Sequence, residues 1–193
     1  ATLALQDIPQ DAMVVDTRNK LEFAEGHIAN SINIQNNKSL ANWAGWMLPY
    51  DKPLVFVAEE QSKEDITRKL MRIGMDNIAG FLSYPEGNLE KSIIVTAEEV
   101  ADQIKDKKTT LLDVRSGAEY IKGHIPGAEH FFVGKLAREL PNIHKDKPLI
   151  IQCQAGDRAT IAASYLTKNG FTNVKTYIGS MQDWVAKKYP VIE

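Results

Sequence analysis

The chain carries one pattern of residues twice, and this internal repeat constrains its fold more than any other feature. One segment begins at Val14 and reads VVDTRNKLEFAEGHIANSINI, and its counterpart begins at Leu111 and reads LLDVRSGAEYIKGHIPGAEHF. Six identical residues recur 97 positions apart, and they are Asp16 and Asp113, Arg18 and Arg115, Glu22 and Glu119, Gly26 and Gly123, His27 and His124, and Ile28 and Ile125. Further on, Pro53-Leu54 matches Pro148-Leu149, 95 positions later. A repeat this long indicates two tandem domains, because solenoid units are shorter.

Chain length and a linker-like segment predict where these domains meet. The 193 residues suffice for two small domains. Residues 83–92, SYPEGNLEKS, combine Pro, Gly and charges of both signs, which is typical of a linker. We therefore expect a first domain over residues 1–88 and a second over residues 89–193.

The second copy alternates short strand patterns with helix patterns. Thr96 and Glu99 form a capping box before the first helix, and the run 148–152, PLIIQ, is typical of a strand buried on both faces. The expected strands are 109–114, 148–152 and 173–177, and the expected helices are 97–106, 116–123, 134–141, 158–170 and 180–188. Such alternation predicts an α/β fold in which each copy has a parallel sheet flanked by helices. Sites in such sheets form at the carboxyl ends of the strands.

Cys153, the only cysteine, stands at one of these strand ends. The loop that follows is Gln154, Ala155, Gly156, Asp157 and Arg158, and a helix is expected to begin at or near its end. Backbone N–H groups and a helix N-terminus that converge on the sulfur would stabilise a thiolate. Gly156 permits a tight curl, and Arg158 adds a charge that can bind an oxyanion or hold the loop.

The sequence leaves three interpretations of this thiol open. Cysteine phosphatases and arsenate reductases of that type use a Cys-x5-Arg loop, whereas the spacing from Cys153 to Arg158 is Cys-x4-Arg. The shorter loop makes a tighter ring of N–H groups, which favours a persulfide over a phosphocysteine. Alternatively, Cys153 is a small buried hydrophobe, and the chain is a binding module without catalysis.

The run DVRSGAEYIKGHIPGA, followed by CQAGDRA, resembles a rhodanese domain, the sulfurtransferase fold of this α/β kind. The segment IGSMQDW resembles the family's closing Gly-Gly and Trp segment, with Ser180 in place of the second Gly. The segments 31–57 and 130–143 are further similar to the tandem rhodanese half of metallo-β-lactamase-fold/rhodanese fusion proteins. The other half of those proteins is a non-haem iron persulfide dioxygenase, and its His-x-His-x-Asp-His cluster does not occur here.

This resemblance implies that Cys153 takes sulfur from thiosulfate or a thiol persulfide and passes it to sulfite, cyanide or a thiol. Asp113, Arg115 and His124 would support the site, and they are expected to be scaffold, because their counterparts recur in the copy without a thiol. That first copy has Ala58 where the second has Cys153, and its acidic loop AEEQSKED lacks Gly-x-Arg. We expect it to be inactive and to serve packing or a partner.

Composition and charge argue against several other functions and locations. A net charge of −2 argues against a general nucleic-acid or anionic-membrane surface, and no apolar run is long enough to span a bilayer. The single cysteine favours a reducing, cytoplasmic setting. The N-terminus does not resemble a secretion signal and lacks an initiator Met, so we expect a processed or excised segment. No metal or cofactor is expected in this chain.

Overall fold

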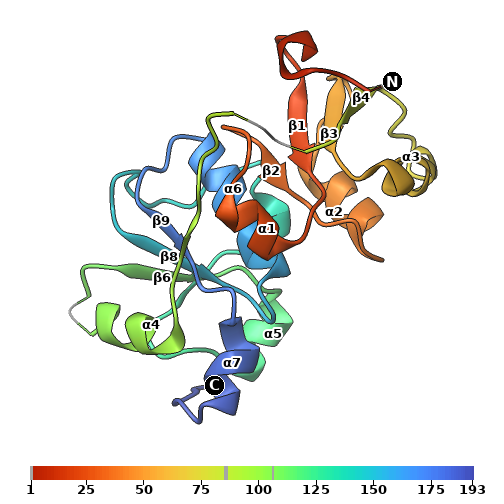
Figure 1. Ribbon diagram of the computed structural model, residues 1–193. Helices are drawn as coiled ribbons and strands as arrows, with labels where there is room; N and C mark the ends of the chain where they lie inside the picture. The colour runs from red at the N-terminus through yellow and green to blue at the C-terminus, as the bar shows by residue number, and fades with distance from the viewer. Residues whose placement is uncertain (1, 85–86, 106) are drawn as a thin grey trace. The chain divides into compact units, whose positions relative to one another are not determined.

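The computed structural model describes residues 2–84, 87–105 and 107–193, and the chain divides into two compact units, Ala1–Lys91 and Ser92–Glu193 (Figure 1). Residues 85–86, within the expected linker 83–92, lie outside the described residues. So does residue 106, at the end of the expected helix 97–106.

The first unit contains a four-stranded parallel sheet in the order β2-β1-β3-β4. Its strands are β1 (Met13–Asp16), β2 (Ile32–Asn33), β3 (Leu54–Val57) and β4 (Ile78–Leu82). Its helices are α1 (Lys20–Glu25), α2 (Leu40–Met47) and α3 (Lys63–Met71), with short 3₁₀ turns η1 (Leu5–Asp7) and η2 (Glu60–Ser62). All four residues of β3 are buried, as expected for a central strand of a parallel sheet.

The second unit contains a five-stranded parallel sheet in the order β5-β9-β8-β6-β7. Its strands are β5 (Ile93–Ile94), β6 (Thr110–Asp113), β7 (Glu129–His130), β8 (Leu149–Gln152) and β9 (Val174–Thr176). Its helices are α4 (Ala97–Gln103), α5 (Gly117–Lys122), α6 (Asp157–Lys168) and α7 (Ser180–Ala186), with the 3₁₀ turn η3 (Val133–Lys135). The predicted α/β class with parallel sheets flanked by helices is therefore confirmed.

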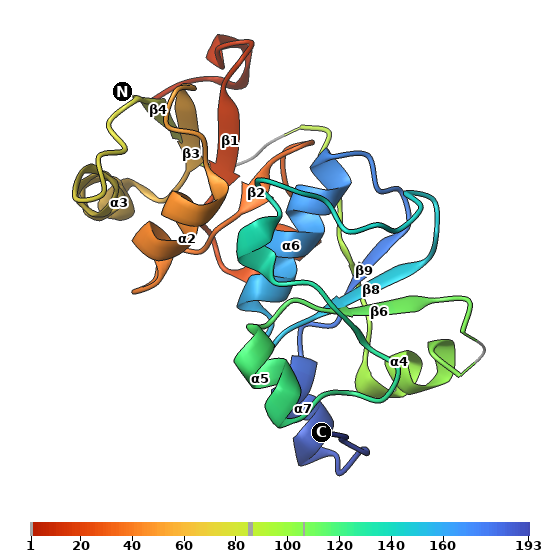
Figure 2. The same cartoon turned by 180° about the vertical axis from the view of Figure 1, so that it is seen from behind.

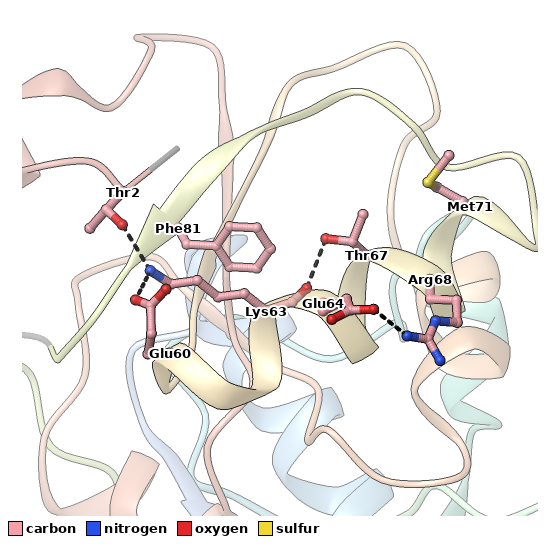
Figure 3. Close-up of a pocket in the computed structure, with 8 residues that line it drawn as sticks. All are labelled: Thr2, Glu60, Lys63, Glu64, Thr67, Arg68, Met71 and Phe81. Carbon is pink, nitrogen blue, oxygen red and sulfur yellow. Dashed lines mark hydrogen bonds and ion pairs between the residues drawn. The ribbon is translucent and has the colours of Figure 1, made fainter.

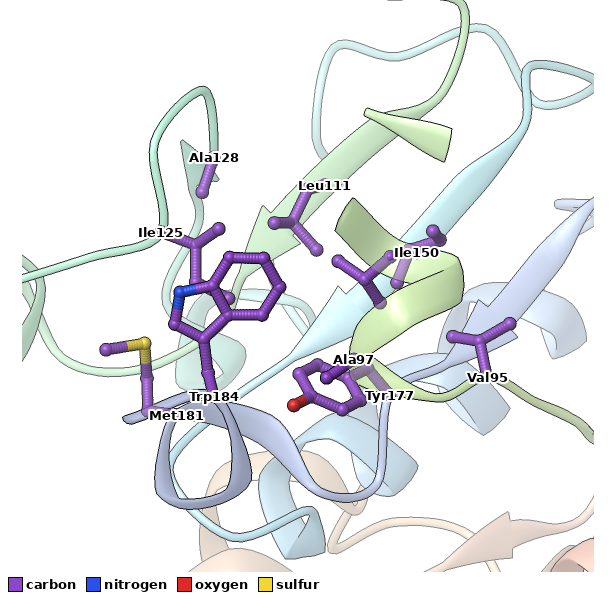
Figure 4. Close-up of a cluster of buried hydrophobic side chains, with 10 residues drawn as sticks. Val95, Ala97, Leu111, Ile125, Ala128, Ile150, Tyr177, Met181 and Trp184 are labelled. Atoms are coloured by element: carbon purple, nitrogen blue, oxygen red, sulfur yellow. The ribbon is translucent and has the colours of Figure 1, made fainter. Parts of the chain in front are cut away.

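A cluster of buried side chains joins the sheet of the second unit to α4 and α7. Leu111 and Ile150 from the sheet meet Trp184 of α7, and Tyr177 packs edge-on to Trp184 with ring centroids 6.4 Å apart (Figure 4). Because successive strand residues point to opposite faces, Leu112 and Ile151 point to the other face of the sheet. The long helix α6 packs against β8 and β9 (Figure 2). The sheet is thus covered on both faces, which explains its continuous apolar strands.

Local signals in the second copy correctly predicted where α4, α5, α6 and α7 lie, although most of their ends differ from the expected ones by one to three residues. The Thr96 capping box opens α4, and Ser116 opens α5 in the same way with Glu119. The expected helix 134–141 is wrong: the chain makes only the 3₁₀ turn η3, followed by further turns. The segment is short and begins near Gly134, it ends at Pro141, and no side chain caps it. The cost of nucleating a helix is therefore not recovered.

Candidate active site in the second unit

Cys153 lies directly after β8, in the middle of the five-stranded sheet. Residues Asp113 and Gln152 are paired in register as the last residues of β6 and β8, so both strands end at the same edge. The cysteine is reduced and only 1 % exposed. The sheet thus places the thiol at the edge where parallel sheets carry their sites.

The loop after Cys153 curls back so that one of its backbone N–H groups meets the sulfur. The Gly156 N–H donates to the Cys153 Sγ at 3.1 Å. Gly156 has φ +93°, and a Cβ there would lie 2.5 Å from the carbonyl oxygen of Ile178. Glycine is therefore required both for the left-handed backbone and for the close approach of Ile178. The helix α6 begins at the next residue, Asp157.

The helix α7 holds this loop from the other side. The Met181 N–H donates to the Cys153 carbonyl at 3.1 Å, and the Gln182 N–H donates to the Gln154 carbonyl at 3.0 Å. In a trans peptide the N–H points opposite to the C=O, so the N–H groups of Gln154 and Ala155 are directed away from α7. The carbonyls of Cys153 and Gln154 are thereby occupied by N–H donors of α7.

Ser180, at the start of α7, is a contact of Cys153 whose role the sequence did not predict. Its Oγ accepts the Cys153 N–H at 3.0 Å, donates to the Tyr177 carbonyl at 2.8 Å and lies 3.8 Å from the sulfur. The residue is fully buried with φ +53°, a left-handed conformation that is uncommon for residues other than glycine. Its position in place of the family's second Gly was the signal that marked it.

Arg158 is directed to Glu119 rather than to the sulfur. Its two terminal nitrogens each donate to one oxygen of Glu119 at 2.7 Å, a bidentate pair. This contact with Arg158 lowers the pKa of Glu119 to about 2. Arg158 thereby ties the start of α6 to α5, which is consistent with holding the loop, and its role in binding an oxyanion stays a prediction.

Asp113 and Arg115 form a buried ion pair beside the site. The Arg115 Nη2 donates to Asp113 at 2.6 Å and to the Gly123 carbonyl at 2.8 Å. His124 donates from Nδ1 to the Tyr120 carbonyl at 3.0 Å and stacks on the Tyr120 ring. All these bonds are made within residues 113–124, and none of them reaches Cys153.

The first unit repeats this scaffold without the thiol. Arg18 Nη2 donates to Asp16 at 2.6 Å and to the Gly26 carbonyl at 2.8 Å. His27 donates to the Phe23 carbonyl at 2.8 Å and stacks on the Phe23 ring. Burial lowers the pKa of His27. These interactions therefore form whether or not a nucleophile is present.

Ala58 follows β3 as Cys153 follows β8. The residues before them, Val57 and Gln152, are both paired in register with the aspartate that ends the neighbouring strand. By the same 95-residue spacing, Lys63 in α3 corresponds to Arg158. The intervening residues form η2 instead of an open loop, and Glu64 and Asp65 lie in the first turn of α3.

The described residues contain neither a group of metal ligands nor a membrane-spanning helix. Over residues 2–84, 87–105 and 107–193, no three His, Cys, Asp or Glu side chains group together as a metal site would require. Within the same residues, every helix is too short or too polar to span a bilayer.

Comparison with known proteins identifies the family of both units. The model of the rhodanese-like domain matches twice, at residues 2–84 and 96–187. The YrkF protein of Bacillus subtilis is 25 % identical over 174 residues, covering 90 % of this chain and 89 % of its own. The thiosulfate sulfurtransferase GlpE of Pseudomonas savastanoi is 32 % identical over 92 residues, covering 48 % of this chain and 86 % of its own. The structure of the human single-domain sulfurtransferase TSTD1 has a TM-score of 0.47 and 25 % identity, over 50 % of this chain and 97 % of its own. The chain belongs to the rhodanese-like family and consists of two rhodanese-like domains in tandem.

Proposed function

We propose that the second unit is a sulfurtransferase that uses Cys153 as its nucleophile. The observation that carries this proposal is the contact of the Gly156 N–H with the Cys153 sulfur, within a loop that Arg158 and α7 hold in place. A buried sulfur that accepts a backbone N–H suits an anionic sulfur species. The match to a thiosulfate sulfurtransferase supports the same chemistry.

The proposed reaction proceeds in two displacements. The Cys153 thiolate attacks the outer sulfur of thiosulfate, the S–S bond breaks, and sulfite leaves with the bonding electrons. A second nucleophile, such as sulfite, cyanide or a thiolate, then attacks the terminal sulfur of the persulfide and releases the Cys153 thiolate. A thiol persulfide can donate its outer sulfur in the same way, with a thiolate as the leaving group. Neither step requires a metal or cofactor held by this chain.

The proposal also covers the cellular setting. The sequence resemblance to metallo-β-lactamase-fold fusion proteins supports a role in sulfide or persulfide detoxification, with a dioxygenase domain in cis supplying sulfite as acceptor. The single free cysteine supports a reducing, cytoplasmic compartment.

The test is the intact mass of the protein after incubation with thiosulfate. Wild type should gain about 32 Da, the mass of one sulfur atom, and cyanide or dithiothreitol should remove it. Cys153→Ser should show no gain. An unchanged mass in wild type, or the same gain in the variant, would contradict the assignment.

One observation favours a second candidate, a binding module without catalysis. Cys153 is only 1 % exposed, so a donor must approach through the exposed residues Gln154 and Ala155. An inert module would label slowly with iodoacetamide at pH 7 and form no persulfide. Rapid labelling together with the mass gain would exclude it.

A further inference from the structure

The first unit retains a small cavity at the position that corresponds to the Cys153 loop. It lies at the carboxyl ends of β1 and β3, has a volume of about 170 Å³, and its lining includes Arg18, Asn19, Glu22, Ala58, Glu59 and Ser62. Pockets for drug-sized ligands usually measure about 300–1,000 Å³, so this cavity suits a small head group.

The cation that corresponds to Arg158 does not enter this cavity. Lys63 instead donates to the Thr2 hydroxyl at 2.8 Å and forms an ion pair with Glu60. Figure 3 shows the Lys63 ammonium between these two side chains. The cation that binds Glu119 in the second unit therefore has no counterpart bound to Glu22 in the described residues of the first unit.

The charge of the cavity is negative. The guanidinium of Arg18 is already bound to Asp16 and to the Gly26 carbonyl. Across the described residues, no lysine or arginine forms an ion pair with the other charged groups of the lining, Glu22 and Glu59. Two carboxylates thus line a cavity whose own cation is neutralised.

The hydrogen-bond partners of both carboxylates are neutral. Glu22 accepts from the Asn19 side chain and from the Tyr84 hydroxyl at 3.3 Å, and Glu59 accepts from the Gln61 amide. The negative charges of Glu22 and, to a smaller extent, Glu59 raise the pKa of Tyr84. The charges of Glu22 and Glu59 therefore both act on the region around Tyr84.

The second unit shows what this carboxylate binds when a partner is available. Glu119, the counterpart of Glu22, accepts two bonds of 2.7 Å from the guanidinium of Arg158. Both glutamates occupy the same position in a capping box at the start of a short helix, so their backbones are held alike. The geometry for binding a guanidinium is thus built into the repeat.

We propose that the cavity of the first unit binds a guanidinium group from outside the unit, with Glu22 as the main ligand and Glu59 as a second anion. The group belongs either to a small guanidine or to an arginine side chain of a peptide. The first unit then serves as a binding domain rather than as a degenerate catalyst. This proposal does not depend on the sulfurtransferase activity of the second unit.

The test is a titration of the full chain with methylguanidinium, followed by two-dimensional NMR. The side-chain amide of Asn19 should shift in a saturable manner, with a dissociation constant on the order of millimolar for so small a probe. Methylurea, a neutral compound of the same shape, should cause no saturable shift. Equal binding of methylurea would overturn the proposal, because charge would then play no part.

Three variants locate the site. Glu22→Gln should weaken methylguanidinium binding by at least about tenfold, and Glu59→Gln should weaken it less. Glu64→Gln is the control, since Glu64 lies on α3, is paired with Arg68 and does not line the cavity. Unchanged binding in Glu22→Gln, or equal losses in all three variants, would refute the assignment. Unaltered amide shifts of first-unit residues far from the cavity would show that the variants are folded.

Two larger probes separate the sources of the group. Agmatine represents a free guanidine, and the blocked tripeptide acetyl-Gly-Arg-Gly-amide represents an arginine side chain. Tighter binding of the tripeptide would indicate a protein partner, whereas tighter binding of agmatine would indicate a small ligand. Failure of both to compete with methylguanidinium would contradict the site.

Discussion

The two units have the same scaffold around different loops. In both, an arginine two residues after the aspartate binds that aspartate and a glycine carbonyl eight residues further on. In both, a histidine donates to the carbonyl four residues before it and stacks on the aromatic ring there. Because the first unit has no thiol, these polar groups are explained by folding rather than by sulfur chemistry.

The units differ in the loop that follows the central strand, which is β3 in the first unit and β8 in the second. In the second unit, Gly156 turns the loop toward the sulfur, and Ser180 with α7 supports it. In the first unit, η2 replaces the loop, and after β4 the described residues form no helix corresponding to α7. The first unit has therefore lost the support of the loop as well as the nucleophile. The activation proposed for Cys153 therefore relies on long-range contacts that the shared scaffold does not supply.

The largest expected effect tests whether a thiol alone is sufficient to make the first unit a sulfurtransferase. In a Cys153→Ser background, Ala58→Cys should leave transfer of sulfur from thiosulfate to cyanide at the background level. We expect a deficit on the order of 10³-fold or more relative to wild type, because the N–H donors and the supporting helix are absent. Turnover near the wild-type rate would mean that the loop does not activate Cys153.

The next largest effect tests whether the buried aspartate–arginine pair stabilises both units equally. Asp113→Asn and Asp16→Asn each leave a buried arginine without its carboxylate, and each should destabilise its own unit by about 3–5 kcal/mol. Amide hydrogen exchange, read from peptides of each unit, measures this. Asp102→Asn removes a surface pair with Lys105 and should have almost no effect. A large loss in only one unit would show that the two scaffolds are not equivalent.

A smaller expected effect tests whether the loop after β8 requires a glycine where the segment after β3 does not. Gly156→Ala should cost about 1–3 kcal/mol, because it forces a left-handed conformation and a clash with the Ile178 carbonyl. Sulfur transfer should fall at least about tenfold as the N–H donors move. The matched control is Gln61→Ala, since Gln61 lies in η2 and tolerates an alanine. Equal effects of the two substitutions on stability would contradict the proposed role of the glycine.

The smallest effect concerns acid stability. Arg158 lowers the pKa of Glu119 from 4.5 to about 2, so the ionised pair stabilises the second unit fully above pH 4.5. This stabilisation is lost as the pH falls from 4.5 toward 2. Since the Glu119 side chain is 35 % exposed, we expect only about 1 kcal/mol.

Urea unfolding of Glu119→Gln at several pH values measures this term, which should disappear from the pH dependence of the second unit. Glu22→Gln is the control and should leave that unit's profile unchanged. If Glu119→Gln keeps the wild-type acid dependence, the ion pair does not contribute in solution.

Much of the fold was predictable because its signals are local. The apolar run 148–152 became β8, the capping box at Thr96 opened α4, and the repeat indicated two α/β domains. The helix expected at 134–141 failed because a short segment without a cap depends on its surroundings. Of the candidate site, the position of Cys153 followed from the strand pattern, whereas the partner of Arg158 did not.

The sequence by itself determined the contacts between near neighbours. The aspartate and arginine of each scaffold lie two residues apart, and each histidine lies four residues from its carbonyl. Once the strand and helix form, these groups have few other partners within reach. Only the tertiary structure decided that Arg158 meets Glu119 across 39 residues, that Ser180 meets Cys153 across 27, and that Lys63 turns to Thr2 across 61. Many polar groups could bind each of these side chains, and the fold determines which of them lies within reach. The spacing of residues in the sequence does not reveal this.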